Sequence, residues 1–307
     1  MRRTGPWATH AALIAVQIAF ASQAVEAKIA MTPLSAGGEG VPPAALAMAR
    51  MLAAAVAFQA LARIGGWLTP TSRRDQLTLA GLSIIGISAN QGLFLLGLRS
   101  TTAMVAVLVS VTIPVFAAGI AVIVGQERPN PRTFIGIFCA VLGIVCLTGV
   151  RALDRGALIV ALNSLSYASY VVFSRNIVRR LGAWTAITWL FTWGALLFAP
   201  IGAATLSRGV PVWTPRGWAF VAYIVLVPTM VAYLANAWAL GRSSVSLVAV
   251  YIYLQPLLAA VLAWVQLGQR LTVRLGVASF LVLLGVLVVA TRRASLSAPP
   301  LPGATTG

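Results

Sequence analysis

Three ionisable residues lie inside or near the ends of the first two apolar runs, Glu26 and Lys28 in one and Arg50 in the other. A charged side chain within a membrane-spanning helix costs roughly 2.5–3.5 kcal/mol and tends to mark a pathway or a partner. Residues two apart on a helix point in different directions, so Arg50 is a better partner for Glu26 than Lys28 is. One hypothesis is that Lys28 or Arg50 holds a substrate carboxylate while Glu26 carries a coupling proton. The alternative is that all three lie near helix ends and extend their charges to water.

Uncharged polar side chains also interrupt the apolar runs, and in LNSLSYASY several recur at helical spacing on one side. Polar groups inside a membrane need partners, so some of these are expected to bond neighbouring helices. The others would line a moderately polar, aromatic cavity suited to an amino acid or an amphipathic metabolite. The candidate substrate-binding residues are Lys28, Arg50, Asn90, Gln91, Asn163, Tyr167, Tyr170, Tyr233, Asn236, Tyr251 and Gln255.

The composition explains why polar side chains are conspicuous in this chain. Sixty per cent of its 307 residues are hydrophobic, the mean hydropathy is +0.93 and 9% are charged, whereas globular domains carry about 25% charged residues. This predicts an all-α polytopic membrane protein embedded in the lipid bilayer. The net charge of +17 does not indicate nucleic acid as a partner, because its arginines are dispersed between apolar runs rather than clustered on one face.

Few residues in the chain could support catalysis. It has one histidine, His10, and two cysteines, Cys139 and Cys146, that lie too far apart on one helix for a disulfide. We therefore expect no metal, no cofactor and no enzyme activity. A membrane-embedded enzyme, which would need a His/Asp cluster or a metal motif, and a lipid-scrambling or structural membrane protein are the alternative functions.

Apolar runs of about 20 residues predict spanning helices. They lie near 8–30, 43–64, 77–98, 102–125, 133–150, 156–174, 184–206, 217–240, 246–267 and 272–291. The first run could also be read as a signal peptide, but the repeat described next requires it as a helix. The segment 294–307 is low in large apolar residues and is expected to be disordered.

A shift of 142 residues aligns the two halves of the chain. It places TIPVFAAGIAVIVGQER on LQPLLAAVLAWVQLGQR, so that Pro114 meets Pro256 and Arg128 meets Arg270. The chain therefore reads as two five-helix repeats, 1–150 and 151–293. The prolines predict helix kinks, which serve either packing alone or the shaping of a central cavity whose halves rock.

An odd number of helices per repeat means that the second repeat enters the membrane from the opposite side. This is the inverted-repeat plan of many secondary transporters. With the amino terminus inside, thirteen arginines fall on the inner side and seven on the outer side. The positive-inside rule thus favours a cell-membrane protein with both termini in the cytoplasm.

Several segments resemble the EamA-type transporters of the drug/metabolite transporter superfamily. Residues 96–145 carry the small-polar cluster, Pro, Ala, Glu and Gly pattern of that family, and 227–272 fit its second copy. Residues 16–31 and the arginine of 45–58 fit its first two helices, although Phe20-Ala21-Ser22-Gln23 stands where the family often has Trp-Gly. The similarity covers about residues 10–293.

The resemblance implies a secondary transporter that moves a small metabolite by alternating access, with export the expected direction. No GxxxxGK[ST] motif occurs, so a gradient, such as that of a coupling proton, or exchange must supply the energy. The resemblance implies a class of protein and leaves the substrate and the oligomeric state open.

Overall fold

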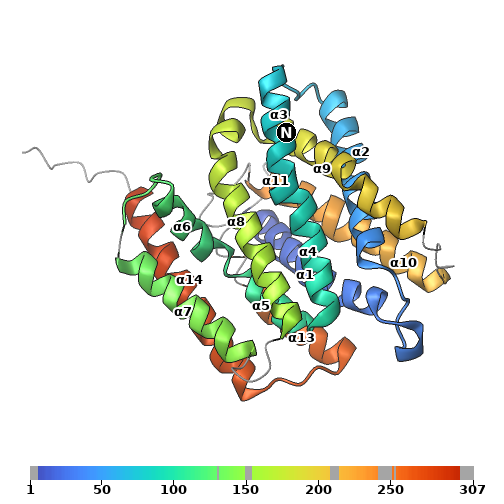
Figure 1. The fold of residues 1–307 in the computed structure, drawn as a ribbon, viewed down its shortest axis with the longest axis vertical. Helices are drawn as coiled ribbons and strands as arrows, with labels where there is room; N and C mark the ends of the chain where they lie inside the picture. Colours follow the sequence, from blue (N-terminus) through green and yellow to red (C-terminus); the bar gives the residue numbers. More distant parts are fainter. Residues whose placement is uncertain are drawn as a thin grey trace, which may run out of the picture.

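The computed structural model describes residues 6–129, 131–148, 154–207, 214–240, 251 and 254–297, and every regular element within these ranges is helical (Figure 1). The helices of the first half are α1 (Pro6–Met31), η1 (Leu34–Ala36), α2 (Pro43–Ile64), α3 (Arg73–Ser83), η2 (Ile84–Ser88), α4 (Ala89–Ser100), α5 (Ala103–Ser110), α6 (Ile113–Ile123) and α7 (Pro131–Thr148). Those of the second half are α8 (Arg155–Leu181), α9 (Ala183–Leu206), α10 (Pro215–Ile224), η3 (Val225–Val231), α11 (Ala232–Leu240), α13 (Gln255–Leu267) and α14 (Val273–Ser297).

Seven stretches of the described chain are helical, long and apolar enough to cross a membrane. They are Trp7–Met31, Pro43–Ile64, Arg73–Ser100, Ala103–Ile123, Arg155–Leu181, Ala183–Thr205 and Pro215–Asn236. Three shorter apolar helices cover Phe134–Gly143, Gln255–Leu267 and Val273–Val288. The prediction of an all-helical polytopic membrane protein is therefore confirmed, and the number of ten spans stays a prediction.

Two of the predicted spans contain a π-helical turn that the sequence analysis did not anticipate. The run 77–98 becomes α3, the π turn η2 and α4, and the run 217–240 becomes α10, the π turn η3 and α11. At Gly86 in η2, a Cβ would lie 2.4 Å from a ring carbon of Tyr170, so glycine is required where the helix meets that ring. Within η3, Pro228 has no backbone N–H group to donate, and the hydroxyl of the next residue, Thr229, donates to the carbonyl of Ile224 (2.9 Å).

Pro114 and Pro256 each stand second in a new helical segment, α6 and α13 respectively. A proline near a helix N-terminus costs little, because its missing N–H would have no intrahelical partner there. The predicted span 102–125 is thus divided into α5 and α6 between Ser110 and Ile113. Residues 246–250, 252 and 253 of the predicted ninth span lie outside the described residues.

The helices pack in pairs that bring the two halves of the chain together. Helix α2 packs against α9, α4 against α8, α1 against α13 and α11, and α7 against α14. The α7–α14 pair, side by side in Figure 1, depends on small residues: a Cβ on Gly143 would lie 2.7 Å from Val282, and one on Gly285 would lie 2.6 Å from the carbonyl oxygen of Gly136. Close approach over glycine is typical of helix packing in membranes.

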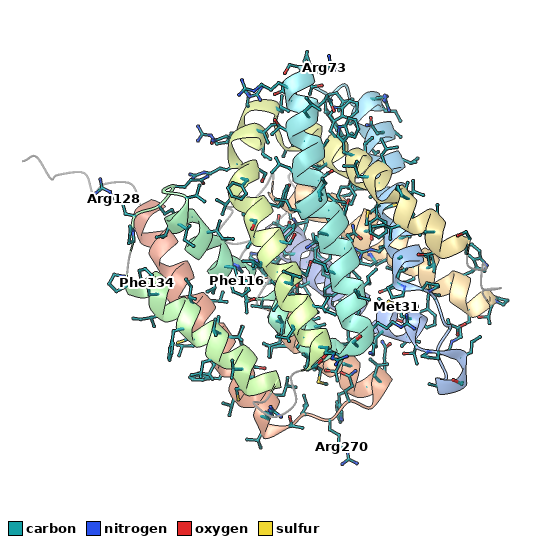
Figure 2. The ribbon with its side chains drawn as sticks, viewed as in Figure 1. Met31, Arg73, Phe116, Arg128, Phe134 and Arg270 are labelled. Carbon is teal, nitrogen blue, oxygen red and sulfur yellow. The ribbon has the colours of Figure 1, made fainter. Side chains whose placement is uncertain are left out.

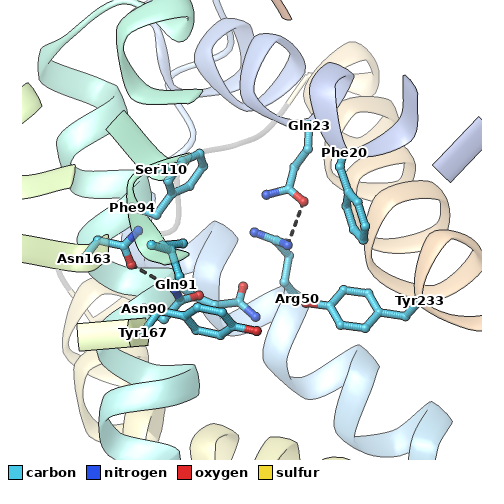
Figure 3. A pocket seen from close by; sticks show the side chains of 11 residues that line it. Phe20, Gln23, Arg50, Asn90, Gln91, Phe94, Ser110, Asn163, Tyr167 and Tyr233 are labelled. Atoms are coloured by element: carbon cyan, nitrogen blue, oxygen red, sulfur yellow. Dashed lines mark hydrogen bonds between the residues drawn. The ribbon is translucent and has the colours of Figure 1, made fainter. Parts of the chain in front are cut away.

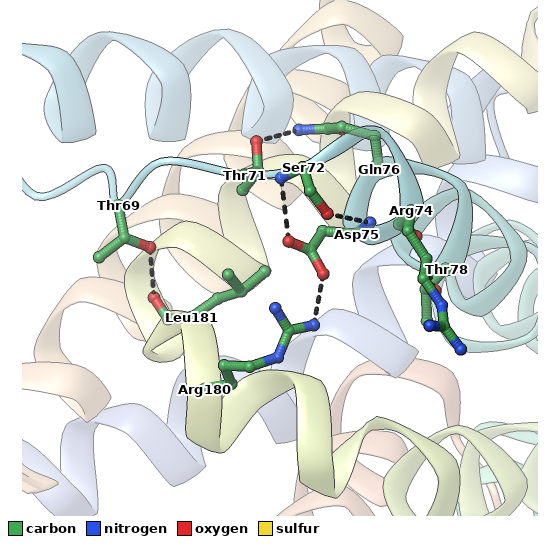
Figure 4. A network of polar contacts seen from close by, with 9 residues as sticks. All are labelled: Thr69, Thr71, Ser72, Arg74, Asp75, Gln76, Thr78, Arg180 and Leu181. Atoms are coloured by element: carbon green, nitrogen blue, oxygen red, sulfur yellow. Dashed lines mark hydrogen bonds and ion pairs between the residues drawn. The ribbon is translucent and has the colours of Figure 1, made fainter.

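An ion pair at one end of the molecule ties the start of α3 to the end of α8. Ser72 and Asp75 form a capping box at the start of α3, which satisfies backbone N–H groups that the helix leaves open. The second carboxylate oxygen of Asp75 accepts a hydrogen bond from Arg180, in the last turn of α8 (Figure 4).

A second ion pair makes a comparable connection. Glu39, in the segment between α1 and α2, pairs with Arg216 in the first turn of α10 at 3.5 Å. The hydroxyl of Thr214, the N-cap of α10, donates to the same carboxylate. The first ion pair therefore joins the start of α3 to the end of α8, and the second joins the start of α10 to the connection between α1 and α2.

The C-terminal helix extends further than the sequence suggested. Helix α14 continues to Ser297, so the first four residues of the segment expected to be disordered, 294–297, are helical. Residues 298–307 lie outside the described residues.

Candidate functional site

A cavity of about 200 Å³ lies among helices of both halves of the chain. It is lined by Phe20, Gln23, Arg50, Asn90, Gln91, Phe94, Ser110, Ile113, Asn163, Tyr167 and Tyr233. In the view of Figure 3, Phe20, Gln23, Arg50 and Tyr233 lie on one side, and the amides of α4 and α8 lie with Tyr167 on the other. The cavity thus has a cationic side and an amide side.

Arg50 supplies the charge of the cavity. Only 4% of the residue is exposed, and its guanidinium donates from Nε to the hydroxyl of Thr229 and from Nη2 to Oε1 of Gln23, both at 3.0 Å. Both partners are neutral, and none of the lining residues is acidic. A buried charge is normally paired with an opposite charge. The hydrogen bonds hold the guanidinium of Arg50 in place, but they supply no counter-charge.

The π turn η3 positions the guanidinium. Thr229 lies within η3, donates its hydroxyl hydrogen to the carbonyl of Ile224 and is left with oxygen lone pairs that accept from Arg50. The hydroxyl of Thr229 thus links the carbonyl of Ile224 in η3 to the guanidinium of Arg50 in α2.

The expected pair between Glu26 and Arg50 is not formed. Arg50 instead reaches Gln23, which precedes Glu26 by three residues on α1. Glu26 is half-buried beside Gln266 of α13 and is not a lining residue of the cavity. The prediction chose the wrong residue on α1, because the charge was visible in the sequence and the rotation of the helix was not.

The amide side of the cavity follows directly after η2. Nδ2 of Asn90 donates to Oδ1 of Asn163 at 3.0 Å, which joins α4 to α8. Gln91 is 5% exposed, and its Oε1 has no hydrogen-bond partner among the described residues. A buried acceptor without a partner is uncommon in native proteins, and this one belongs to a residue that lines the cavity.

Aromatic rings define the remaining walls. Tyr233 is held edge-on by Phe20, Phe58 and Phe191, with ring centroids 5.6, 6.2 and 6.0 Å apart. Tyr167 contacts Tyr170 at a centroid distance of 5.4 Å. The three contacts of Tyr233 are edge-to-face, an arrangement that aromatic pairs prefer.

Lys28, the other cation proposed for the site, lies elsewhere. Its Nζ donates to the carbonyl oxygens of Leu98, Arg99 and Thr101 at 2.9, 2.8 and 2.7 Å. These carbonyls belong to the end of α4, where an α-helix leaves its last carbonyls without partners. Lys28 therefore caps α4, and all three of its N–H donors are used.

The other sequence candidates outside the cavity lie on the same helices or contact other side chains. Tyr170 packs over Gly86, and Asn236 lies one turn after Tyr233 on α11. Oη of Tyr251 lies 2.6 Å from Nδ1 of His10. Nε2 of Gln255 donates to Gln17 at 2.7 Å. Arg50, Asn90, Gln91, Asn163, Tyr167 and Tyr233 are the candidates that the structure brings together.

Sequence analysis missed several residues of the site, namely Phe20, Gln23, Phe94, Ser110, Ile113 and the supporting Thr229. Gln23 could have been found, since it is a polar residue in the middle of the first apolar run. Phe20, Phe94 and Ile113 carry no such signal, because an apolar side chain in an apolar helix looks the same whether it faces lipid or a cavity.

The lining side chains have the chemistry of a binding site. Among the described residues, no three His, Cys, Asp or Glu side chains gather in a way that could hold a metal ion. The lining side chains offer a fixed cation, amides, phenols and aromatic rings, which can hold a small anionic or zwitterionic solute.

Comparison with known proteins gives a consistent result. The chain matches the model of the EamA-like transporter family twice, over residues 8–149 and 154–291. An uncharacterized transporter of Archaeoglobus fulgidus is 24% identical over 269 residues, covering 85% of this chain and 90% of that protein. The uncharacterized transporter YdfC of Bacillus subtilis is 25% identical over 246 residues, covering 77% of this chain and 78% of that protein.

One solved structure, described as the crystal structure of a protein, has a similar fold. The TM-score is 0.60 at 20% sequence identity, and the match covers 96% of this chain and all of the other.

Proposed function

We propose that this chain, which belongs to the EamA-like transporter family, is a secondary transporter that moves a small solute with an anionic group across the cell membrane. The solute is an amino acid or an amphipathic metabolite, export is the direction, and Arg50 binds the anionic group. Transport proceeds by alternating access of two inverted five-helix repeats, driven by a coupling proton or by exchange.

The observation that carries this proposal is the state of Arg50. An ionisable residue at membrane depth is a candidate for function, because its burial is costly. Arg50 is 4% exposed and bonds only neutral side chains in a cavity of about 200 Å³. A solute anion would supply the missing counter-charge. Cavities for drug-sized ligands measure about 300–1,000 Å³, so the volume favours a smaller solute.

The positions of irregular backbone support the inverted repeat. The 142-residue shift carries η2 (84–88) onto 226–230, which lies within η3 (Val225–Val231). It also carries the start of α6 at Ile113 onto the start of α13 at Gln255. A single shift of 142 residues therefore matches both the π turns and the helices that begin next to a proline. This agreement fits two halves built on a common five-helix unit.

The helix pairs support it as well. Under the same shift the α4–α8 pair becomes α11–α1, and both pairs are in contact. The α2–α9 and α7–α14 pairs exchange their members and map onto themselves. This contact pattern fits two repeats related by a two-fold axis, the arrangement in which many secondary transporters rock around a central site.

Counterflow in liposomes tests the function. Purified protein should exchange labelled amino acids or small carboxylated metabolites, and Arg50→Ala should abolish that exchange. Arg50→Lys should retain only part of it, because an ammonium does not reproduce a bidentate guanidinium–carboxylate contact. Arg63→Ala is the matched control, since Arg63 lies exposed in the last turn of α2, the helix that carries Arg50.

Three results would contradict the proposal. Full activity of Arg50→Ala would remove Arg50 from the site. Movement of labelled lipid between leaflets without solute exchange would favour a lipid-scrambling protein. Chemical conversion of the solute would favour a membrane-embedded enzyme.

A further inference from the structure

The amide of Gln91 has a property that binding an anion does not explain. Its Oε1 is buried without a hydrogen-bond partner among the described residues, and the residue lines the cavity. An anionic group has nothing to donate to this oxygen. A buried acceptor in a ligand-sized cavity therefore indicates a donor that arrives with the ligand.

Neighbouring donors are directed to other acceptors and not to this oxygen. Nδ2 of Asn90 donates to Oδ1 of Asn163, and Arg50 donates from Nε to Thr229 and from Nη2 to Gln23. The hydroxyl of Ser110 donates to the carbonyl of Ala106 at 2.9 Å. Among the described residues, some guanidinium N–H groups of Arg50 and the amide oxygen of Gln91 have no partner. This combination fits a ligand that carries both an acceptor-rich anion and a donor.

We propose that Gln91 is a specificity-determining residue whose Oε1 accepts a hydrogen bond from an amine of the solute. The site then selects zwitterions, molecules that carry a carboxylate for Arg50 and an ammonium for Gln91, over carboxylates of the same shape without the amine. This inference rests on the proposed function and specifies its substrate class.

The physical basis is the penalty for an unpaired buried polar atom. A ligand without the amine leaves Oε1 of Gln91, which is already buried, without a hydrogen-bond donor. That penalty weakens binding by about 10- to 100-fold. A ligand with the amine avoids it.

The test compares matched ligand pairs on purified protein in lipid nanodiscs, where binding is measured without permeation of the free acids. The pairs are L-alanine with propanoate, L-valine with 3-methylbutanoate, and L-phenylalanine with 3-phenylpropanoate. The measured quantity is the ratio of the two dissociation constants within a pair. This ratio does not depend on the fraction of protein that is correctly folded.

Wild-type protein should prefer the amino acid of at least one pair by about 10- to 100-fold. Gln91→Met, which keeps the side-chain length and removes the amide, should bring that ratio close to one. Gln91→Leu serves if the methionine variant does not fold, and Gln91→Glu, which keeps an acceptor, should retain the preference. The matched control is Gln59→Met: Gln59 also has a buried Oε1 without a partner among the described residues, but it bonds Thr192 outside the cavity. It should keep the wild-type ratio.

The outcomes separate this inference from the proposed function. If the wild-type protein binds neither member of any pair in an Arg50-dependent manner, the proposed function fails and the inference fails with it. If binding depends on Arg50 but the wild type treats both members alike, or Gln91→Met keeps the wild-type ratio, the inference alone is wrong.

Discussion

Two cations of the chain, Lys28 and Arg50, look equivalent in the sequence and differ in the structure. The ammonium of Lys28 is surrounded by three carbonyl oxygens at the end of α4, whereas the guanidinium of Arg50 meets only neutral side chains in a cavity. The N–H donors of Lys28 all have carbonyl acceptors, whereas the positive charge of Arg50 has no negative charge beside it. A cation that caps a helix end has a structural role, and a cation without a counter-charge is ready for a ligand.

Glu26 is the residue on which proton coupling can be tested. Its carboxyl is half-buried beside Gln266, one turn along α1 from the Gln23 that bonds Arg50. If Glu26 carries the coupling proton, Glu26→Gln should preserve solute exchange between the two sides of a liposome. It should abolish accumulation driven by a proton gradient, because an amide cannot release a proton.

The measurement is uptake of labelled solute with and without an imposed pH gradient. Glu127→Gln, which neutralises an acid at the end of the fourth predicted span, should leave gradient-driven accumulation intact. Unchanged accumulation in Glu26→Gln would assign the coupling proton to another group.

At the scale of the element, the π turns determine where the polar side chains point. A π turn adds a residue to a helical turn, so it rotates everything that follows relative to a regular helix. Asn90 and Gln91 come directly after η2, Thr229 lies within η3, and Tyr233 comes directly after it. Asn90, Gln91, Thr229 and Tyr233 thus owe their orientation to two local irregularities in otherwise apolar helices.

The Asp75–Arg180 pair gives a prediction at this scale. Asp75→Asn and Arg180→Gln should each lower the thermal midpoint of the purified protein. The midpoint of the double variant should fall by less than the sum of the two single decreases, because both changes remove the same ion pair. The loss should be larger for Asp75→Asn, since Asp75 also accepts from the backbone N–H of Ser72. Thermal unfolding of the four proteins in one detergent measures this.

Arg179→Gln is the control for that cycle. Arg179 is the exposed neighbour of Arg180 in the last turn of α8, and its neutralisation should leave the midpoint unchanged. Strictly additive losses in the Asp75 and Arg180 variants would show that the pair contributes nothing to stability.

At the scale of the molecule, the inverted repeat makes a prediction about topology. Figure 2 shows Arg73, on the predicted inner side, and Arg270, on the predicted outer side, at opposite ends of the molecule. A reporter active only outside the cell should therefore give a signal when fused after Asp154. It should stay silent when fused after Arg128.

The reverse pattern would overturn the cytoplasmic assignment of the termini. A pair of fusions in the connections 124–130 and 268–272 tests the repeat itself, because corresponding connections of inverted repeats lie on opposite sides. A signal from both, or from neither, would contradict the inverted arrangement.

The sequence by itself determined the class of this protein. An apolar fraction of 60% with 9% charged residues leaves a membrane as the only environment that suits such a chain, and the lack of water there makes helices the natural way to satisfy the backbone. The approximate places of the apolar helices and the resemblance to the EamA-like family also followed, because both depend on residue order along the chain. The family is confirmed, and the ten spans with their inverted repeat stay predictions.

Only the tertiary structure decided which polar groups meet. Lys28 and Arg50 separated into a helix cap and a cavity cation, and Gln23 rather than Glu26 became the partner of Arg50. Periodicity gives the face of a regular helix, but the π turns η2 and η3 shift that face at the residues concerned. An aromatic residue such as Phe20 does not stand out in an apolar run, so the sequence cannot show that its ring faces the cavity. The sequence specifies which groups are available, and helix packing determines which of them are left without partners.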